Sequence, residues 1–176
     1  MGIRVIQQHG SHSRKDIWWK MIVSIAILGL LGFIFSRYPA ENGDGWYHQL
    51  ELPYFAPPYW LPFVMWTLVY ILMGCSVGIV WHHAVKSTGV RTLKLAKTRL
   101  VLFSIHLVFN LLFPLFLIGF HLPVISLIDI VILLLFIAVL IRYFYRIHPT
   151  ASYLLLPYFF WILYATILNI SIIVLN

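Results

Sequence analysis

Long apolar stretches separated by short polar segments run along the whole chain. Five of them are long enough to cross a bilayer, which takes about 20 mostly apolar residues. They lie at residues 17–38, 59–82, 100–119, 122–145 and 152–174. Little chain is left outside them. The pattern therefore predicts an all-α membrane protein, a bundle of five transmembrane helices with no separate soluble domain.

The composition supports this prediction. The chain is 62% hydrophobic and only 10% charged, and its mean hydropathy is +0.94. About half of a soluble domain is apolar, so 176 residues could not bury this excess away from water. The composition excludes a soluble globular protein.

The basic residues predict an orientation in the membrane. Eleven of the 12 lysines and arginines precede or begin the first stretch, lie between the second and third, or lie at the end of the fourth or just after it; only Arg37 lies on the other side. Basic residues accumulate on the cytoplasmic side of membrane proteins. We therefore expect the N-terminus inside and the C-terminus outside, and the bias favours a bacterial cytoplasmic membrane over a mitochondrial outer membrane. It does not indicate binding to nucleic acid.

Two segments outside the apolar stretches have distinct characters. Residues 1–16 are polar and basic, and we expect an unstructured cytoplasmic tail preceding the membrane domain, residues 17–176. Residues 39–58, together with the start of the second stretch, concentrate rings and prolines: Trp46, Tyr47, Pro53, Tyr54, Phe55, Pro57, Pro58, Tyr59 and Trp60. Proline stiffens the backbone, and indole and phenol rings favour the membrane interface. This segment, called the lid below, should be ordered and able to cover a flat hydrophobic ligand.

Few polar side chains fall within the apolar stretches. Asp129 is costly there and should face the bundle interior. His106 and Asn110 are four residues apart on one helical face, and Asn169 lies in the last stretch. They could contact a ligand, or they could form hydrogen bonds between helices. Hydrogen bonds between helices are the favoured interpretation for Asp129, Asn110 and Asn169. For His106 the choice between the two interpretations is more open.

Other features indicate packing more than chemistry. Gly74 and Gly78 would let another helix approach closely, either within the bundle or in a dimer, and we favour the bundle. Pro114 and Pro157 should kink their helices. His82 and His83 are adjacent and point about 100° apart on a helix, so no metal site is expected from them. No catalytic motif is visible.

Three segments together resemble the translocator protein family (TspO/MBR, also called tryptophan-rich sensory proteins or peripheral-type benzodiazepine receptors). The first is W-Y-x-x-L-x-x-P from Trp46 to Pro53, followed by P-P-x-W ending at Trp60. The second is V-M-W-T-L-V-Y-I-L-M-G from Val64 to Gly74, and the third is L-L-x-P-Y-x-x-W-x-x-Y-A-T-x-L-N from Leu154 to Asn169. The resemblance covers about residues 20–176.

This resemblance implies five transmembrane helices, often in a homodimer, with a pocket beneath the loop between the first two helices. The family's ligands are porphyrins, benzodiazepine-like drugs and, in animals, cholesterol, so a tetrapyrrole such as haem or a sterol-like molecule is the expected partner. No obligatory cofactor is implied. Carried over by motif, the expected ligand-binding residues are Trp46, Tyr47, Leu50, Pro53, Trp60, Trp66, Asn110, Trp161, Ala165 and Leu168.

The chain departs from the family pattern at four positions. Leu52 replaces a lysine, Phe55 and Phe113 each replace a tryptophan, and His106 replaces a glutamine. The two phenylalanines keep a ring for stacking but lose a redox-active indole. His106 adds a group that could act as an axial ligand or in acid–base chemistry, and it joins the expected ligand-binding residues.

Three functions follow as hypotheses. The first is a membrane receptor or carrier that binds porphyrin-like tetrapyrroles and serves tetrapyrrole or stress regulation. The second is a structural or regulatory membrane subunit. The third is an enzyme that degrades porphyrins with Trp66 and Trp161 as redox participants. We rank them in this order.

Overall fold

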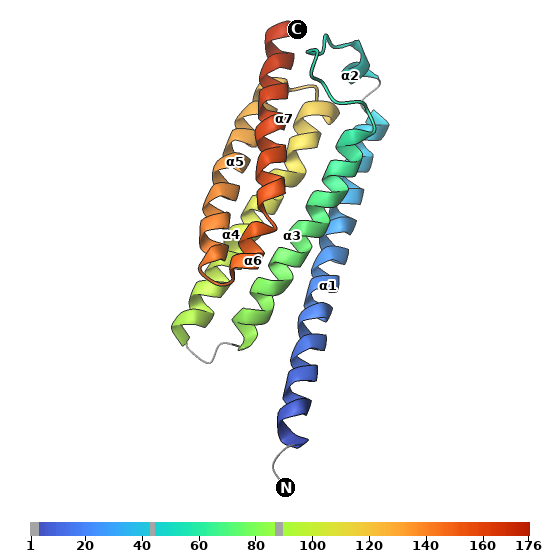
Figure 1. Ribbon diagram of the computed structural model, residues 1–176. Coiled ribbons are helices and arrows are strands. Elements are labelled where there is room, and N and C mark those ends of the chain that lie inside the picture. Colours follow the sequence, from blue (N-terminus) through green and yellow to red (C-terminus); the bar gives the residue numbers. More distant parts are fainter. Residues whose placement is uncertain (1–3, 43–44, 87–89) are drawn as a thin grey trace.

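A computed structural model describes residues 4–42, 45–86 and 90–176, and the side chains of residues 15–34, 45–83 and 97–176. The described chain is a bundle of long helices lying side by side (Figure 1). Their order is α1 (Arg4–Asn42), α2 (Trp46–Gln49), α3 (Leu61–Lys86), α4 (Val90–Pro114), the π-helical turn η1 (Leu115–Gly119), α5 (Pro123–Tyr145), α6 (Pro149–Tyr153) and α7 (Leu156–Leu175).

The described part of the chain confirms the predicted fold class. It contains five helices that are long and apolar enough to cross a membrane: Lys15–Ile34, Leu61–His83, Lys97–Gly119, Pro123–Tyr145 and Pro149–Leu175. The chain is a multi-pass integral membrane protein. Its two ends lie at opposite ends of the bundle, as an odd number of crossings requires (Figure 1).

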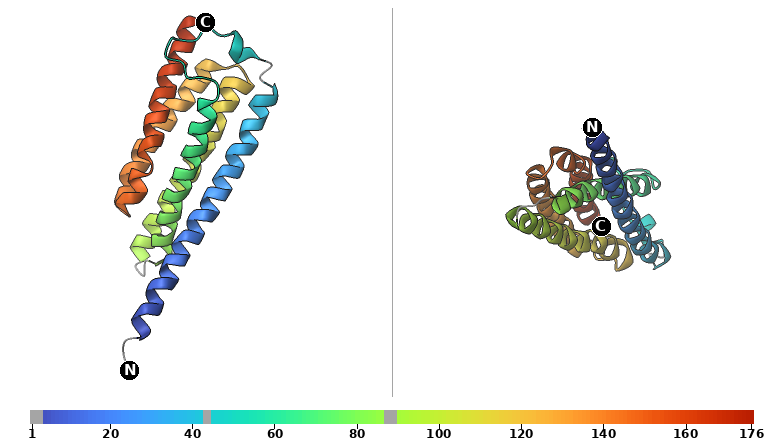
Figure 2. Two further views of the ribbon diagram at one scale, coloured as in Figure 1. Left: turned by 45° about the vertical axis from the view of Figure 1, so that its right-hand side comes forward. Right: turned by 90° about the horizontal axis from the view of Figure 1, so that it is seen from below.

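Neighbouring helices pack in an order that leaves α1 at one side. Helix α1 lies against α3, α4 packs on α5, and α5 also contacts α6 and α7. The view along the bundle shows α1 crossing the outside of the other helices (Figure 2). The short helix α2 and residues 50–60 of the lid lie over the end of the bundle where α3 begins and α7 ends (Figure 1). Residues 39–42 of the predicted lid belong to α1, and residues 43–44 lie outside the described residues.

Helix α5 illustrates how the sequence divides between core and lipid. Leu133, Ile137, Leu140 and Phe144 recur at helical spacing and are fully buried. Leu135, on the opposite face, is 64% exposed. Large apolar side chains on an outer surface are favourable only next to other apolar groups, so this face contacts lipid.

The first helix is longer than the sequence predicted. It begins at Arg4 and not near residue 17, and it runs to Asn42, so the expected unstructured tail is helical from residue 4. Residues 4–16 contain no proline, and adding residues to an existing helix avoids the unfavourable nucleation step. Among the residues of α1 whose side chains are described, the part that is apolar enough to span the membrane is Lys15–Ile34.

The two predicted proline kinks take other forms. Pro114 ends α4, and the chain continues in the π-helical turn, where Phe120 N–H donates to Leu115 C=O at 2.8 Å. Pro157 lies in the first turn of α7, where its missing N–H leaves no hydrogen bond unmade. The expected single helix over residues 152–174 is instead α6 and α7, separated at residues 154–155.

The small residues of α3 confirm packing inside the bundle. A Cβ atom added at Gly74 would lie 2.6 Å from Ile25 Cα, and one added at Gly78 would lie 2.5 Å from Met21 Cα. Both glycines therefore allow the backbones of α1 and α3 to touch.

Candidate functional site

The lid is fastened to the end of the bundle by hydrogen bonds and ring contacts. Tyr164 Oη donates to Phe55 C=O at 2.9 Å, and Glu51 N–H donates to Asn176 Oδ1 at 2.9 Å. The Trp46 indole stacks on the His121 ring, with 4.6 Å between ring centroids. The lid therefore contacts α7 and the connection before α5, which makes it the ordered cover that the sequence predicted.

Tyr47 lies in the short helix α2 of the lid and is half-buried. Its burial, with Tyr164 and Tyr59 close by, raises the pKa of the Tyr47 hydroxyl above its usual value. Tyr47 is therefore a neutral hydrogen-bonding group throughout the physiological pH range.

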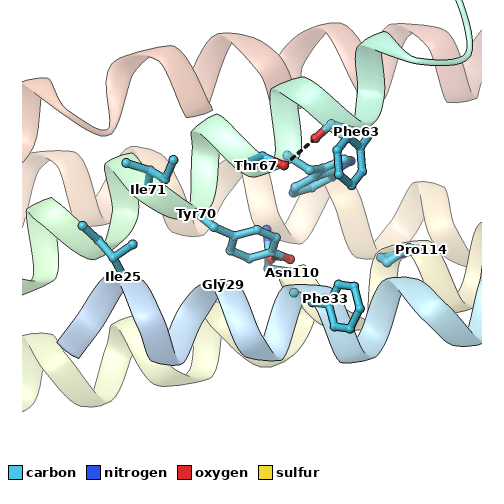
Figure 3. A pocket seen from close by; sticks show the side chains of 11 residues that line it. Ile25, Gly29, Phe33, Phe63, Thr67, Tyr70, Ile71, Asn110 and Pro114 are labelled. Carbon is cyan, nitrogen blue, oxygen red and sulfur yellow. Dashed lines mark hydrogen bonds between the residues drawn. The ribbon is translucent and has the colours of Figure 1, made fainter. Parts of the chain in front are cut away.

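Below the lid, the described side chains leave a cavity of about 300 Å³ between α1, α3 and α4. Figure 3 shows its walls. They are formed by Ile25, Gly29, Gly32, Phe33, Phe63, Trp66, Thr67, Tyr70, Ile71, Asn110 and Pro114. Phe33 and Phe63 are 61% and 73% exposed, so the cavity opens sideways through the wall of the bundle.

A chain of hydrogen bonds begins at the cavity and continues into the core. Tyr70 Oη donates to Asn110 Oδ1 at 2.9 Å, and Asn110 Nδ2 donates to Tyr158 Oη at 2.8 Å. Tyr158 Oη lies 3.1 Å from His106 Nε2 and can donate to it. The chain joins α3, α4 and α7 through four side chains, and its first and second members face the cavity.

A glycine of α1 positions the first member of this chain. A Cβ atom added at Gly32 would collide with the ring of Tyr70. The absence of a side chain at Gly32 lets the Tyr70 ring lie against the backbone of α1 (Figure 3), from which its hydroxyl reaches Asn110.

Within the membrane-spanning helices, the buried polar atoms of the described side chains that have no hydrogen-bond partner within the molecule include His106 Nδ1, Asp129 Oδ2 and Trp161 Nε1. Asp129 faces the interior, as predicted, and is only 4% exposed. Asn169 forms the predicted contact between helices, because its amide lies 2.6 Å from Ser126 Oγ of α5. Among the described residues, no three His, Cys, Asp or Glu side chains are grouped closely enough to hold a metal ion.

The structure separates the predicted ligand-binding residues into three groups. Trp66 and Asn110 line the cavity, and His106 is connected to it through Tyr158. Trp161 and Ala165 are buried and Leu168 is half-buried in α7, none of them at the cavity wall. The lid group does not line the cavity either: Trp46, Tyr47, Leu50, Pro53 and Trp60.

The sequence did not predict the two tyrosines that are hydrogen-bonded to Asn110. Tyr70 is one helical turn after Trp66, and Tyr158 directly follows Pro157. A signal was available, because a phenol inside an apolar helix needs a hydrogen-bond partner when it is buried. Tyr158 is completely buried.

The arrangement of five apolar helices, an aromatic lid and a Trp-lined cavity agrees with a known family. The model of the TspO/MBR family matches residues 21–175. The chain belongs to the TspO/MBR family.

Relatives of this TspO/MBR protein cover nearly the whole chain. It is 34% identical to the tryptophan-rich protein TspO of Archaeoglobus fulgidus over 157 residues, which span 89% of this chain and 97% of the relative. It is 34% identical to the tryptophan-rich protein TspO of Chlorobaculum tepidum over 165 residues, 89% of this chain and 98% of the relative. The human translocator protein is 30% identical over 152 residues, 86% of this chain and 87% of the relative.

Proposed function

We propose that this TspO/MBR protein is a membrane receptor or carrier for porphyrin-like tetrapyrroles and serves tetrapyrrole or stress regulation. The observation that carries the proposal is the lateral cavity of about 300 Å³ beneath the lid, with the indole of Trp66 in its wall. Ligand pockets are mostly apolar and aromatic with a few placed polar groups. This cavity has that character.

The side chains that line the cavity determine which part of a ligand can enter it. Trp66 and Phe63 offer flat apolar surfaces, while Tyr70 and Asn110 supply a hydroxyl and an amide. No Lys or Arg lines the cavity in the described part of the chain. A buried carboxylate without a cation is strongly unfavourable, so the propionates of a porphyrin would stay outside and an apolar edge of the macrocycle would enter.

The cavity volume lies at the lower end of the range for ligand pockets, about 300–1,000 Å³. A macrocycle would therefore insert edge-on through the opening beside Phe33 and Phe63, with the remainder of the ring in the opening. The human relative is named a translocator, which supports a carrier over a purely structural subunit.

The test is a titration of the purified full chain in nanodiscs with protoporphyrin IX, followed by the absorbance of the porphyrin. This readout does not depend on the tryptophan that is being replaced. Trp66→Leu removes the aromatic wall, and stacking contributes about 0.5–1.5 kcal/mol, so Kd should rise about twofold to tenfold. Trp19→Leu is the matched control, because Trp19 is 64% exposed on α1 and should leave Kd unchanged.

A second pair of variants tests the location directly. Gly29 lines the cavity and has open space where its Cβ would be, so Gly29→Phe should fill the cavity and abolish saturable binding. Ile27→Phe adds a ring at a position that is 54% exposed outside the cavity and should bind normally. Absence of saturable binding to the unaltered chain, or equal binding by Gly29→Phe, would contradict the proposal.

A further inference from the structure

A second concave surface lies on other helices, at the end of the bundle remote from the lid. It is a groove of about 540 Å³ between the last turns of α5 and the segment formed by α6 and the start of α7. Its lining consists of Ala138, Ile141, Arg142, Tyr145, Arg146, Ser152, Tyr153 and Leu156. None of these residues lines the cavity described above.

Local hydrogen bonds hold the two walls of the groove together. Ser152 Oγ donates to Ile141 C=O at 2.8 Å, which fixes α6 against α5. The chain reverses between them in a tight turn, in which the N–H groups of Ile147 and His148 each donate to Phe144 C=O at 2.9 Å. The groove is therefore a preformed feature of the fold.

The charges at one end of the groove are not neutralised. Arg142 and Arg146 are one helical turn apart and both are exposed. Neither guanidinium group forms an ion pair or a hydrogen bond with the part of the chain that the structure describes, and no acidic residue lines the groove. Arg99, which lies over the Tyr143 ring, is close enough to Arg146 for their charges to repel. This end of the groove attracts an anion.

The other end of the groove is apolar and continues along the lipid-facing surface. Ala138, Ile141 and Leu156 lead away from the arginines toward the middle of the membrane span. Tyr145 and Tyr153 flank the charged end, with 6.0 Å between their ring centroids. Tyrosine favours the depth of lipid headgroups. The groove is therefore basic at the depth of the lipid headgroups and apolar toward the middle of the membrane. A phospholipid has the same order, from its charged headgroup to its acyl chains.

We propose that this groove binds an anionic phospholipid, with the phosphate at Arg142 and Arg146 and an acyl chain along Ala138 and Leu156. The planar guanidinium donates paired hydrogen bonds to phosphate oxygens, which suits arginine to this role. Basic pockets between helices on the cytoplasmic side are a known form of lipid recognition. The site is separate from the tetrapyrrole cavity and does not depend on it.

The test is native mass spectrometry of the full chain in detergent with equal amounts of phosphatidylglycerol and phosphatidylcholine. A basic residue near an anionic lipid contributes about a fivefold preference, so the two arginines predict about 25-fold more bound phosphatidylglycerol than phosphatidylcholine. Arg142→Gln/Arg146→Gln should lose this preference. The conservative Arg142→Lys/Arg146→Lys should keep part of it, because the charge remains and the paired hydrogen bonds do not.

A matched variant separates the groove from general surface charge. Lys15→Gln/Lys97→Gln removes the same two charges from exposed positions on α1 and α4 and should retain the full preference. Ala138→Trp should weaken lipid binding by obstructing the apolar end, and glycerol phosphate, which lacks acyl chains, should not displace the bound lipid. Equal binding of the two lipids by the unaltered chain, or an equal loss in the lysine variant, would overturn the proposal.

Discussion

At the scale of single residues, one phenol joins two other buried polar side chains. Tyr158 is completely buried, accepts a hydrogen bond from Asn110 Nδ2 at 2.8 Å and lies 3.1 Å from His106 Nε2. Because Tyr158 Oη accepts from Asn110, its own hydrogen is available for His106. This orients the Asn110 amide so that its oxygen meets Tyr70 at the cavity.

Tyr158→Phe should therefore destabilise the protein although it removes a single oxygen atom. The change leaves Asn110 Nδ2 and His106 Nε2 buried without their partner, and an unsatisfied buried group costs about 1–3 kcal/mol. Reversible unfolding of the chain with SDS in mixed micelles measures this free energy. Tyr54→Phe is the control, because Tyr54 is fully exposed, and a change below about 0.5 kcal/mol is expected there. Equal stability of the two variants would show that the hydrogen-bond chain contributes nothing.

The site could be predicted from sequence only in part, and Asn110 and Tyr158 show why. Asn110 attracts notice because an amide in a membrane helix needs a partner, and the family resemblance also assigns Asn110 to the pocket. Tyr158 has a mostly apolar side chain and is 48 residues away in sequence, so no local pattern connects it to Asn110. The arrangement of α4 against α7 brings them together, and this arrangement depends on packing over the whole bundle.

At the scale of helices, the contact between α1 and α3 depends on side chains that are absent. The backbones touch at Gly74 and Gly78. Nearer the lid, the Tyr70 ring occupies the space where a side chain at Gly32 would be. Close backbone approach is how helices associate in lipid, where burial of apolar surface supplies no driving force. The same close contact fixes the position of one wall of the cavity.

Gly78→Ala should weaken this contact. Alanine normally stabilises a helix by about 0.5–1 kcal/mol relative to glycine. Here the added Cβ would lie 2.5 Å from Met21 Cα, so the helices must separate, and the expected net loss is about 1–3 kcal/mol. Gly29→Ala is the matched control, because its Cβ would meet nothing within 4 Å and should be neutral or stabilising. SDS unfolding of both variants gives the comparison, and a Gly78→Ala variant as stable as Gly29→Ala would contradict the close contact.

The helices themselves were more predictable than their ends. The apolar stretch at 122–145 matches α5, Pro123–Tyr145, almost residue for residue, because Pro123 starts the helix and the apolar run is long. Hydropathy gave a poor boundary for α1, since the polar residues from Arg4 continue the helix without contributing to the membrane span. Hydropathy also missed the break between α6 and α7, because the apolar run continues across it. Pro157 lies in the first turn of α7, a position typical of a helix start.

At the scale of the whole molecule, the fold gives the two ends of the bundle different chemistry. The lid, with its rings and prolines, covers one end, while the start of α4 and the end of α5 lie at the end where the N-terminus emerges (Figure 1). The basic positions Lys97, Arg99, Arg142 and Arg146 belong to this second end. The structure thus brings basic segments that are distant in sequence to one membrane surface, and the excess of Lys and Arg predicts that this surface faces the cytoplasm.

Cysteine labelling in intact bacterial cells tests this orientation. The only native cysteine, Cys75, is half-buried in α3 and is first replaced by alanine. Tyr54→Cys introduces a fully exposed thiol in the lid, and it should react with a membrane-impermeant maleimide added outside the cells. Lys97→Cys, exposed at the opposite end, should react only after permeabilisation, which also controls for the intrinsic reactivity of each thiol. The reverse pattern would place the lid in the cytoplasm, and with it the lipid groove in the outer leaflet.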